Sequence, residues 1–275
     1  MGVLNVTPDS FSDGGTFLDP EAAIAHGLRL AFEGADLLDV GGESTRPGAE
    51  AVSEREELAR VIPVIEGIRA RDAGARISID TSKAAVAAAA LDAGADYVND
   101  VTALRGDPEM AAVVAERDVS VCLMHMLGTP RTMNQLARYD DVVEDVKAFL
   151  AERIETAVAA GIALERIEVD PGIGFAKNLG HNLELLDRLP ELAELGRPIV
   201  LGTSRKSFLG TITGRETAER VAGTLATVVM GYERGARIFR VHDVAPARDA
   251  LAVAAATLAR AWPATSPRTT RTTTT

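Results

Sequence analysis

The chain has 275 residues, 47% of them hydrophobic and 25% charged, which is enough apolar content to bury a large core and excludes an intrinsically disordered protein. A formal net charge of −11 argues against a nucleic-acid or membrane partner held by bulk electrostatics. The chain opens with no cationic leader, holds no apolar run near the ~20 residues that span a bilayer, and has a single cysteine, Cys122. We therefore expect a cytoplasmic protein without an intramolecular disulfide.

Apolar runs typical of buried strands alternate with helical patterns along almost the whole chain, which favours a parallel sheet built from βα units. The predicted strands are residues 2–6, 36–40, 76–80, 96–100, 119–125, 166–170, 198–202 and 237–241. Eight such units in this length favour a closed (β/α)8 TIM barrel over an open doubly wound sheet. We expect one domain over residues 1–262 and a disordered tail over residues 263–275, whose Ser, Thr, Pro and Arg content cannot build a core.

Capping signals and apolar periodicity predict helices between the strands. The first helix begins after Asp19 and Pro20, which read as its N-cap and first helical residue. Its expected apolar face holds Ile24, Leu28, Ala31 and Phe32. A capping box at Ser53 and Glu56 opens the next helix, which Pro63 should kink. Further helices are predicted over residues 82–93, 107–116, 140–160, 181–195, 217–233 and 246–261.

Four Gly-Ala dipeptides, which begin at Gly34, Gly74, Gly94 and Gly235, each stand between a predicted helix and the next predicted strand. A glycine directly after a helix can adopt the left-handed backbone conformation that caps the last turn. We therefore predict that each of these glycines ends its helix in that conformation.

Polar side chains follow the predicted strands at the point where each strand ends. In a (β/α)8 barrel these ends meet at one rim, so we expect the side chains to converge on one ligand site. Carboxylates and an amide suit the N–H donors of a heterocycle, whereas cationic groups suit phosphate oxygens. The first group is Asp80, Asn99 and Asp170, and the second is Arg46, Lys206, Arg240 and His242. We predict a cleft with an acidic part for a heterocycle and a cationic part for phosphate.

Seven segments carry distinctive combinations of glycine, proline and polar residues. They are MGVLNVTPDSFSDGG at residues 1–15, DVGGESTRPG at 39–48, SIDT at 78–81, ND at 99–100, DPGIGF at 170–175, SRKSF at 204–208 and RVHD at 240–243. Together these segments closely resemble the dihydropteroate synthase family, and the likeness runs from residue 1 to about residue 261. Members of that family usually carry residues upstream of the first strand that cover the barrel bottom, whereas this chain begins at that strand.

The resemblance implies condensation of 6-hydroxymethyl-7,8-dihydropterin diphosphate with 4-aminobenzoate, which gives 7,8-dihydropteroate and diphosphate in folate biosynthesis. It places the pterin between Asp80, Asn99, Asp170 and Lys206. It places the diphosphate against Asn5, Thr45, Arg46, Arg240 and His242, with Mg²⁺ as the cofactor in contact with Asn5. It places 4-aminobenzoate against Phe11, Pro47, Phe175, Lys206 and Ser207.

The mechanism that the resemblance implies begins with loss of diphosphate, which leaves a cationic dihydropterin methylene for the aniline nitrogen to attack. Lys206, Arg240 and His242 are the catalytic residues that it implies, because a cationic cluster and a metal stabilise charge on the leaving group. Asp13, on the first loop, would stabilise the carbocation once that loop closes. The family also implies a homodimer whose other partners are small-molecule substrates.

Three competing interpretations use the same residues. A pterin-binding methyltransferase of the folate and corrinoid type shares the barrel but binds no diphosphate, so the cationic cluster counts against it. A catalytically inactive pterin-binding relative would have lost residues of the first or second loop, and both loops are intact here. An aldolase that forms a Schiff base could use Lys206 but would leave Asp80, Asn99 and Asp170 without a role.

Overall fold

The computed structural model describes residues 1–7, 19–45 and 48–259. The predicted end of the domain at residue 262 and the predicted tail over residues 263–275 therefore lie outside the described residues. None of the helices in the described part of the chain combines the length and the apolar content that crossing a membrane requires.

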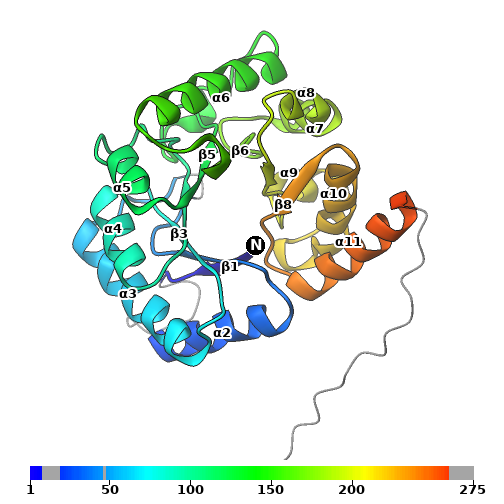
Figure 1. Cartoon of the computed structure of the whole chain (residues 1–275). Coiled ribbons are helices and arrows are strands. Elements are labelled where there is room, and N and C mark those ends of the chain that lie inside the picture. Colours follow the sequence, from blue (N-terminus) through cyan, green and yellow to red (C-terminus); the bar gives the residue numbers. More distant parts are fainter. Residues whose placement is uncertain (8–18, 46–47, 260–275) are drawn as a thin grey trace, which may run out of the picture.

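Eight parallel strands form one sheet in sequence order, and the helices surround it (Figure 1). The strands are β1 Gly2–Asn5, β2 Leu38–Gly41, β3 Ile77–Asp80, β4 Tyr97–Asp100, β5 Ser120–Met124, β6 Ile167–Asp170, β7 Ile199–Leu201 and β8 Ala236–Phe239. The sheet closes where Gly2 pairs with Val241, whose backbone N–H donates to the Met1 carbonyl oxygen over 3.0 Å. The predicted (β/α)8 barrel is confirmed.

The helices begin close to their predicted starts. They are α2 Pro20–Phe32, α3 Glu54–Arg71, α4 Ala84–Asp92, α5 Met110–Arg117, α6 Val142–Ala159, α7 Leu179–Asp187, α8 Leu189–Ala193, α9 Ser207–Thr213, α10 Val221–Glu233 and α11 Val244–Ala259. The Ser53 hydroxyl accepts from the Glu56 backbone N–H over 3.2 Å, as a capping box predicts. The Glu56 carboxylate, however, pairs with Arg60 on the next turn. Helix α3 continues through Pro63 to Arg71 without ending.

The predicted apolar face of α2 is confirmed at Ile24, Leu28 and Ala31, which lie in or against the core, and is wrong at Phe32. Phe32 is 88% exposed, and the buried residues are Ala23, Ile24, Gly27 and Leu30. Small residues mark the packing face here because α2 lies very close to its neighbour. A Cβ atom at Gly27 would lie 2.6 Å from Cδ1 of Ile68 in α3.

Two further helix predictions are corrected. The helix predicted over residues 181–195 divides into α7 and α8, because Pro190 lies in the first turn of α8 and proline starts a helix more readily than it continues one. Helix α9 follows β7 directly and was not predicted, because its seven residues are too few to show a clear periodicity.

Three of the four predicted glycine caps are confirmed. Gly34, Gly94 and Gly235 have φ angles of +98°, +110° and +105°, which is left-handed backbone. The prediction for Gly74 is wrong. There α3 ends with Asp72 in extended backbone, whose N–H donates to the Ile68 carbonyl oxygen, and the Asp72 carboxylate accepts from the Gly74 N–H over 3.0 Å in a turn after the helix.

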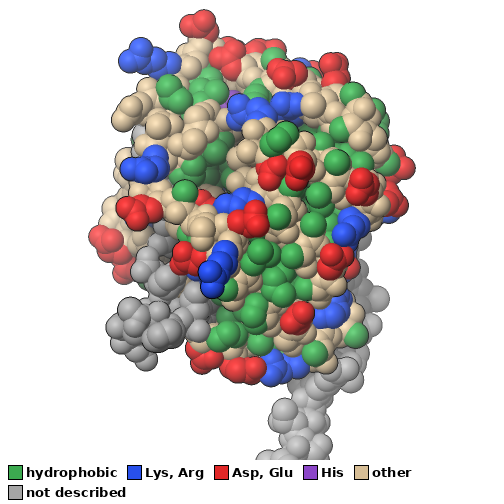
Figure 2. Space-filling model, turned by 90° about the vertical axis from the view of Figure 1, so that its left-hand side faces the viewer, with side chains coloured by type: hydrophobic (Ala, Val, Ile, Leu, Met, Phe, Trp, Pro, Cys, Tyr) green, Lys and Arg blue, Asp and Glu red, His purple; other side chains and the backbone are tan. Residues whose placement is uncertain are grey.

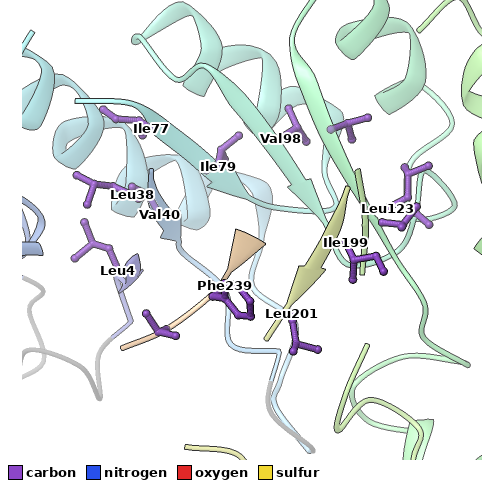
Figure 3. Close-up of a cluster of buried hydrophobic side chains, with 14 of the residues drawn as sticks. Leu4, Leu38, Val40, Ile77, Ile79, Val98, Leu123, Ile199, Leu201 and Phe239 are labelled. Atoms are coloured by element: carbon purple, nitrogen blue, oxygen red, sulfur yellow. The ribbon is translucent and has the colours of Figure 1, made fainter. Parts of the chain in front are cut away.

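The strands divide their side chains between the helices and the barrel interior, since successive residues point to opposite faces. The outward side chains join the helices in the main apolar core, where Leu4, Val40, Ile79, Val98 and Leu123 are fully buried (Figure 3). The alternate positions point inward. They form a smaller apolar cluster of Leu37, Tyr97, Cys122 and Val200. The inward positions near the C-terminal strand ends are polar, and they build the site.

The outer surface mixes charges of both signs. Figure 2 shows the side of the molecule that carries α3, α4 and α5, where Lys and Arg side chains are interspersed with Asp, Glu and apolar side chains.

Candidate functional site

A hydrogen-bonded network fills the barrel interior below the rim. The Arg240 guanidinium donates through Nε to Asp39 Oδ2 over 2.5 Å and through a terminal nitrogen to Asp80 Oδ2 over 2.7 Å. The Ser78 hydroxyl donates to Asp39 Oδ1 over 2.6 Å, and the Asn99 amide donates to Asp39 Oδ2 over 3.2 Å. Both carboxylates are buried, so the charge of Arg240 stabilises them more strongly than it would in water.

The ionisation of this network follows from burial. Burial raises the pKa of Asp80 to about 7, although the Arg240 guanidinium opposes the shift. Burial also acts to lower the pKa of Arg240, but Asp39 and Asp80 outweigh it and raise that pKa above its usual value. Arg240 therefore stays charged. Sequence reasoning gave no role to Asp39, although a carboxylate between the apolar Leu38 and Val40 of a strand is a signal for an inward-facing polar group.

A second group of side chains surrounds Gly202 at the end of β7. A Cβ atom at Gly202 would lie 3.8 Å from each of three atoms: Asp170 Oδ2, Lys206 Nζ and Arg240 Cβ. These three residues come from the ends of β6, β7 and β8, as the sequence predicts. The missing side chain of Gly202 leaves open the space between the Asp170 carboxylate, the Lys206 ammonium and the Cβ atom of Arg240.

Asp170 and Lys206 have opposite pKa shifts with one common cause. Burial raises the pKa of Asp170, and Lys206 counteracts it. Burial lowers the pKa of Lys206 to about 8, and Asp170 counteracts it. The Asp170 carboxylate is held by the Gly172 N–H, which donates to Oδ1 over 2.6 Å. Lys206 donates to the Ile173 carbonyl oxygen, and its Nζ lies 4.7 Å from the centre of the Phe175 ring.

The remaining predicted residues that the structure describes lie at the same rim. Asn5 ends β1 opposite Gly41, Thr45 follows β2, and Ser207 begins α9. His242 follows β8, and its Nδ1 lies 2.9 Å from the Ser204 hydroxyl oxygen, which also accepts from the His242 backbone N–H over 3.1 Å. Phe11, Asp13, Arg46 and Pro47 lie outside the described residues.

The cationic and acidic parts of the rim are less separate than predicted. Arg240 belongs to the cationic set but lies between two carboxylates of the acidic half, Asp39 and Asp80. The cause is barrel closure, because β8 then lies beside β1, and only β1 and β2 separate it from β3.

Beneath the second loop, a cation joins two acidic residues. Lys83, at the start of α4, donates to the carboxylates of Glu43 and Glu57. Burial acts to lower the pKa of Lys83, but its hydrogen bonds to the Glu43 and Glu57 carboxylates raise it, so Lys83 stays charged. Arg60 also donates to the Gly42 carbonyl oxygen over 2.6 Å. These contacts anchor the base of the loop that carries Thr45.

The comparisons with known proteins agree with this geometry. A family model described as pterin binding enzyme matches residues 1–242. The dihydropteroate synthase of Escherichia coli strain K12 is 47% identical over 258 residues, which cover 94% of this chain and 91% of that protein. The structure of Xanthomonas albilineans dihydropteroate synthase with 4-aminobenzoic acid aligns with a TM-score of 0.88 and 54% identity, covering 94% of this chain and 92% of that one.

Two further solved structures show other ligands in similar proteins. The X. albilineans enzyme in complex with 7,8-dihydropteroate aligns with a TM-score of 0.84 and 50% identity, covering 94% of this chain and 92% of that one. The Yersinia pestis dihydropteroate synthase in a complex with a sulfonamide drug aligns with a TM-score of 0.89 and 45% identity, covering 94% and 93% of the two chains.

Proposed function

The chain belongs to the pterin-binding enzyme family, and on that premise we propose a role for each part of its barrel rim. It is a transferase of the dihydropteroate synthase type, which condenses 6-hydroxymethyl-7,8-dihydropterin diphosphate with 4-aminobenzoate to give 7,8-dihydropteroate and diphosphate. The observation that carries the assignment of roles is the convergence of Asp170, Lys206 and Arg240 around Gly202.

The pterin binds between Asp80, Asn99, Asp170 and Lys206. Asp170 accepts from the 2-amino group and the neighbouring ring N–H, because a carboxylate matches two parallel donors. Support comes from the burial of Asp170 and from its Gly172 contact, which holds one oxygen in place before the ligand arrives. Because the Asp170 carboxylate is already held in place, less conformational freedom is lost when the ligand binds.

The diphosphate binds against Asn5, Thr45, Arg240 and His242, together with Arg46. Arg240 is held from behind by Asp39 and Asp80, which fixes the guanidinium in the barrel without neutralising its hydrogen-bonding capacity. His242 is held by Ser204. Two fixed donors at the same rim suit a leaving group that gains negative charge as its bond to carbon breaks.

The 4-aminobenzoate binds against Phe175, Lys206 and Ser207, together with Phe11 and Pro47. The Lys206 ammonium, 4.7 Å from the Phe175 ring centre, pairs with the substrate carboxylate, while the ring packs on the benzene face. Lys206 thus lies where the two substrates meet, which agrees with the prediction that it contacts both the pterin and 4-aminobenzoate.

The reaction proceeds by dissociation and capture. The bond between the pterin methylene carbon and the diphosphate oxygen breaks, and its electron pair leaves with the diphosphate. The aniline nitrogen then attacks the cationic carbon with its lone pair, and the new C–N bond is complete when that nitrogen loses a proton. Arg240 and His242 stabilise the departing charge, and Asp13 of the first loop stabilises the cation.

Mg²⁺ fits the site as an ion bound jointly with the substrate. Magnesium keeps several waters and usually takes one or two protein oxygens together with substrate phosphates. Asn5 supplies one amide oxygen at the rim, and the described residues contain no group of three or more His, Cys, Asp or Glu that could hold a metal. When bound, the ion would neutralise charge on the diphosphate.

Titration calorimetry tests this arrangement of the metal. Because one amide oxygen is a weak site by itself, Mg²⁺ should bind only weakly to the protein alone and clearly more tightly once pterin diphosphate is present. EDTA should stop turnover. Tight Mg²⁺ binding to the protein alone would contradict a site that is shared with the substrate.

The proposed roles are tested first by product formation. The purified protein with Mg²⁺ and pterin diphosphate should release diphosphate in step with dihydropteroate once 4-aminobenzoate is added. Diphosphate release without 4-aminobenzoate would measure capture of the cation by water. If pterin diphosphate binds tightly and no dihydropteroate forms, the proposed arrangement of catalytic groups is wrong.

A pH profile tests the charge of Lys206. Because the pKa of Lys206 is lowered to about 8, its ammonium is lost as the pH rises through that value. The kcat/KM for 4-aminobenzoate should therefore fall above about pH 8. The variant Lys206→Arg, which stays charged, should lose this alkaline limb whatever its absolute rate. A wild-type profile that is flat between pH 7 and 10 would contradict the role.

We propose that the chain forms a homodimer. The adjacent helices α7, α9 and α10 carry Leu183, Ile212 and Met230, which are 43%, 53% and 39% exposed. Light scattering should give twice the chain mass of 29.0 kDa, and Ile212→Asp should shift the protein toward the single-chain mass. A single-chain mass for the unmodified protein at micromolar concentration would reject the dimer.

We propose the cytoplasm as its location. The only cysteine, Cys122, is a buried free thiol, which suits a reducing compartment. Fractionation of cells that produce the full chain tests this directly.

A further inference from the structure

The loop after β6, residues 171–177, is held along its length by side chains from outside it. The Gly174 N–H donates to the Asn182 side-chain oxygen over 2.7 Å, and the Tyr139 hydroxyl donates to the Ala176 carbonyl oxygen over 2.9 Å. Lys206 donates to the Ile173 carbonyl oxygen, as described above. The loop is therefore tied to the segment between β7 and α9, to the segment that precedes α6 and to α7.

Lys177, the last residue of this loop, makes the remaining tie. Its Nζ donates to the Phe175 carbonyl oxygen over 2.9 Å and lies 2.9 Å from Nδ1 of His125. Lys177 is 7% exposed and His125 is 2% exposed. Neither partner of Lys177 is a carboxylate, which is unusual for a buried lysine. Neither residue belongs to the proposed contacts of the pterin, the diphosphate or 4-aminobenzoate.

The hydrogen bond between the two side chains defines the state of the ring. Burial lowers the pKa of His125 to about 2, so the imidazole is neutral. With a Lys177 N–H as the donor, Nδ1 of His125 accepts and the ring proton lies on Nε2. The ring also packs edge-on against Phe149, with 4.8 Å between the ring centres. His125 is therefore a fixed acceptor.

The backbone of His125 is in direct contact with the start of the same loop. Its N–H donates to the Asp170 carbonyl oxygen over 3.0 Å. A Cβ atom at Gly172, whose φ is +68°, would lie 1.9 Å from the His125 carbonyl oxygen, so only glycine allows this approach. A shift of His125 or Lys177 is thus transmitted to the loop and its Phe175 ring.

We propose that Lys177 and His125 are positioning residues for the 4-aminobenzoate subsite, an inference that rests on the proposed role of Phe175. In the described state two lysines hold carbonyls of one loop, Lys206 that of Ile173 and Lys177 that of Phe175. When the Lys206 ammonium turns to the substrate carboxylate, its tie to the loop is lost. The Lys177–His125 pair then keeps the Phe175 ring in place.

Steady-state kinetics of Lys177→Met test the proposal. The variant should raise KM for 4-aminobenzoate about tenfold, the loss expected for one buried hydrogen bond, while kcat at saturation and KM for pterin diphosphate change less than about threefold. A residue that only supports the fold would lower the melting temperature or kcat without this split. Equal increases in both KM values, or a fall in kcat alone, would overturn the proposal.

Two matched variants of His125 test the positioning role even if Lys177→Met fails to fold. The variant His125→Asn keeps an acceptor oxygen near the position of Nδ1, whereas His125→Leu has none. The Asn variant should have a KM for 4-aminobenzoate close to the wild-type value, and the Leu variant should show the tenfold increase expected for the lost bond. Equal KM values in the two variants would overturn the proposal.

The variant Phe175→Ala separates this proposal from the function on which it rests. If Phe175→Ala leaves KM for 4-aminobenzoate unchanged, the proposed subsite itself is wrong. If Phe175→Ala raises that KM and the Lys177 and His125 variants do not, the subsite stands and only the positioning role is rejected.

Discussion

Replacing Asp170 with Asn should lower kcat/KM for the pterin substrate by about 10³-fold, because a buried site built to accept hydrogen bonds would present a donor instead. The Gly172 N–H now donates to Oδ1 of Asp170, and an asparagine would keep its single oxygen at that contact. Its NH₂ group would then face the pterin donors. The change also removes the negative charge that strengthens those bonds.

The fold should tolerate this substitution. Asparagine has the shape of aspartate, and burial raises the pKa of Asp170, which means that its charge is already costly in the folded state. Thermal melting and kinetics should be measured together. Near-normal kcat/KM in a folded Asp170→Asn variant would reject the role of Asp170 in holding the pterin.

Glu168→Gln is the matched control for Asp170→Asn. Glu168 lies two residues earlier in β6, faces the opposite end of the barrel and accepts from the Tyr97 hydroxyl. The same loss of charge there should leave kcat/KM within about twofold of the wild type, since no substrate group reaches that end. A large loss in both variants would indicate a general effect of charge in β6 and not a role of Asp170 in binding.

Replacing Arg240 with Met should affect both stability and binding. The change leaves the buried carboxylates of Asp39 and Asp80 without their cation, which costs about 3–5 kcal/mol of unfolding free energy for a buried pair that loses one partner. It should also weaken binding of the pterin diphosphate far more than binding of a pterin without the diphosphate. Equal loss of affinity for both ligands would contradict the proposed contact.

The stability loss should depend on pH. The folded pKa of Asp80, about 7, lies above its unfolded value of about 3.9, so between these values the folded state binds more protons and stability falls as the pH rises. Without Arg240 the pKa of Asp80 rises further, so the decrease in stability continues to higher pH. Denaturant unfolding should therefore show a smaller difference between Arg240→Met and the wild type at pH 5 than at pH 8.

Arg205→Met provides the control for Arg240→Met. Arg205 pairs with Asp243 through two hydrogen bonds at the same end of the barrel, but its side chain is 32% exposed. Loss of such a partly exposed pair should lower the free energy of unfolding by about 1 kcal/mol or less. It should not weaken binding of the pterin diphosphate much more than binding of a pterin without the diphosphate. A stability loss as large as that of Arg240→Met would show that burial of the carboxylates is not the cause.

Much of the architecture was predicted because it depends on local signals. Each predicted strand contains the observed strand or lies within two residues of it, since apolar runs between glycine and polar segments are read along the chain. The strand ends then located Asp80, Asn99, Asp170 and Lys206, because parallel strands in a barrel all end at one rim. The assignment of Arg240 and His242 to that rim followed from the same rule.

The sequence by itself thus determined the number and order of the βα units, the rim on which the polar groups meet and, through long motifs, the family. Only the tertiary structure decided which of those groups touch. Arg240 lies 201 and 160 residues from Asp39 and Asp80, and Lys177 lies 52 residues from His125, so their contacts exist only once the barrel has closed. The same holds for α2, where Gly27 lies close to Ile68 of α3 and Phe32 is exposed. Pairings of this kind depend on distances between strands and helices, which a linear pattern of residue types does not contain.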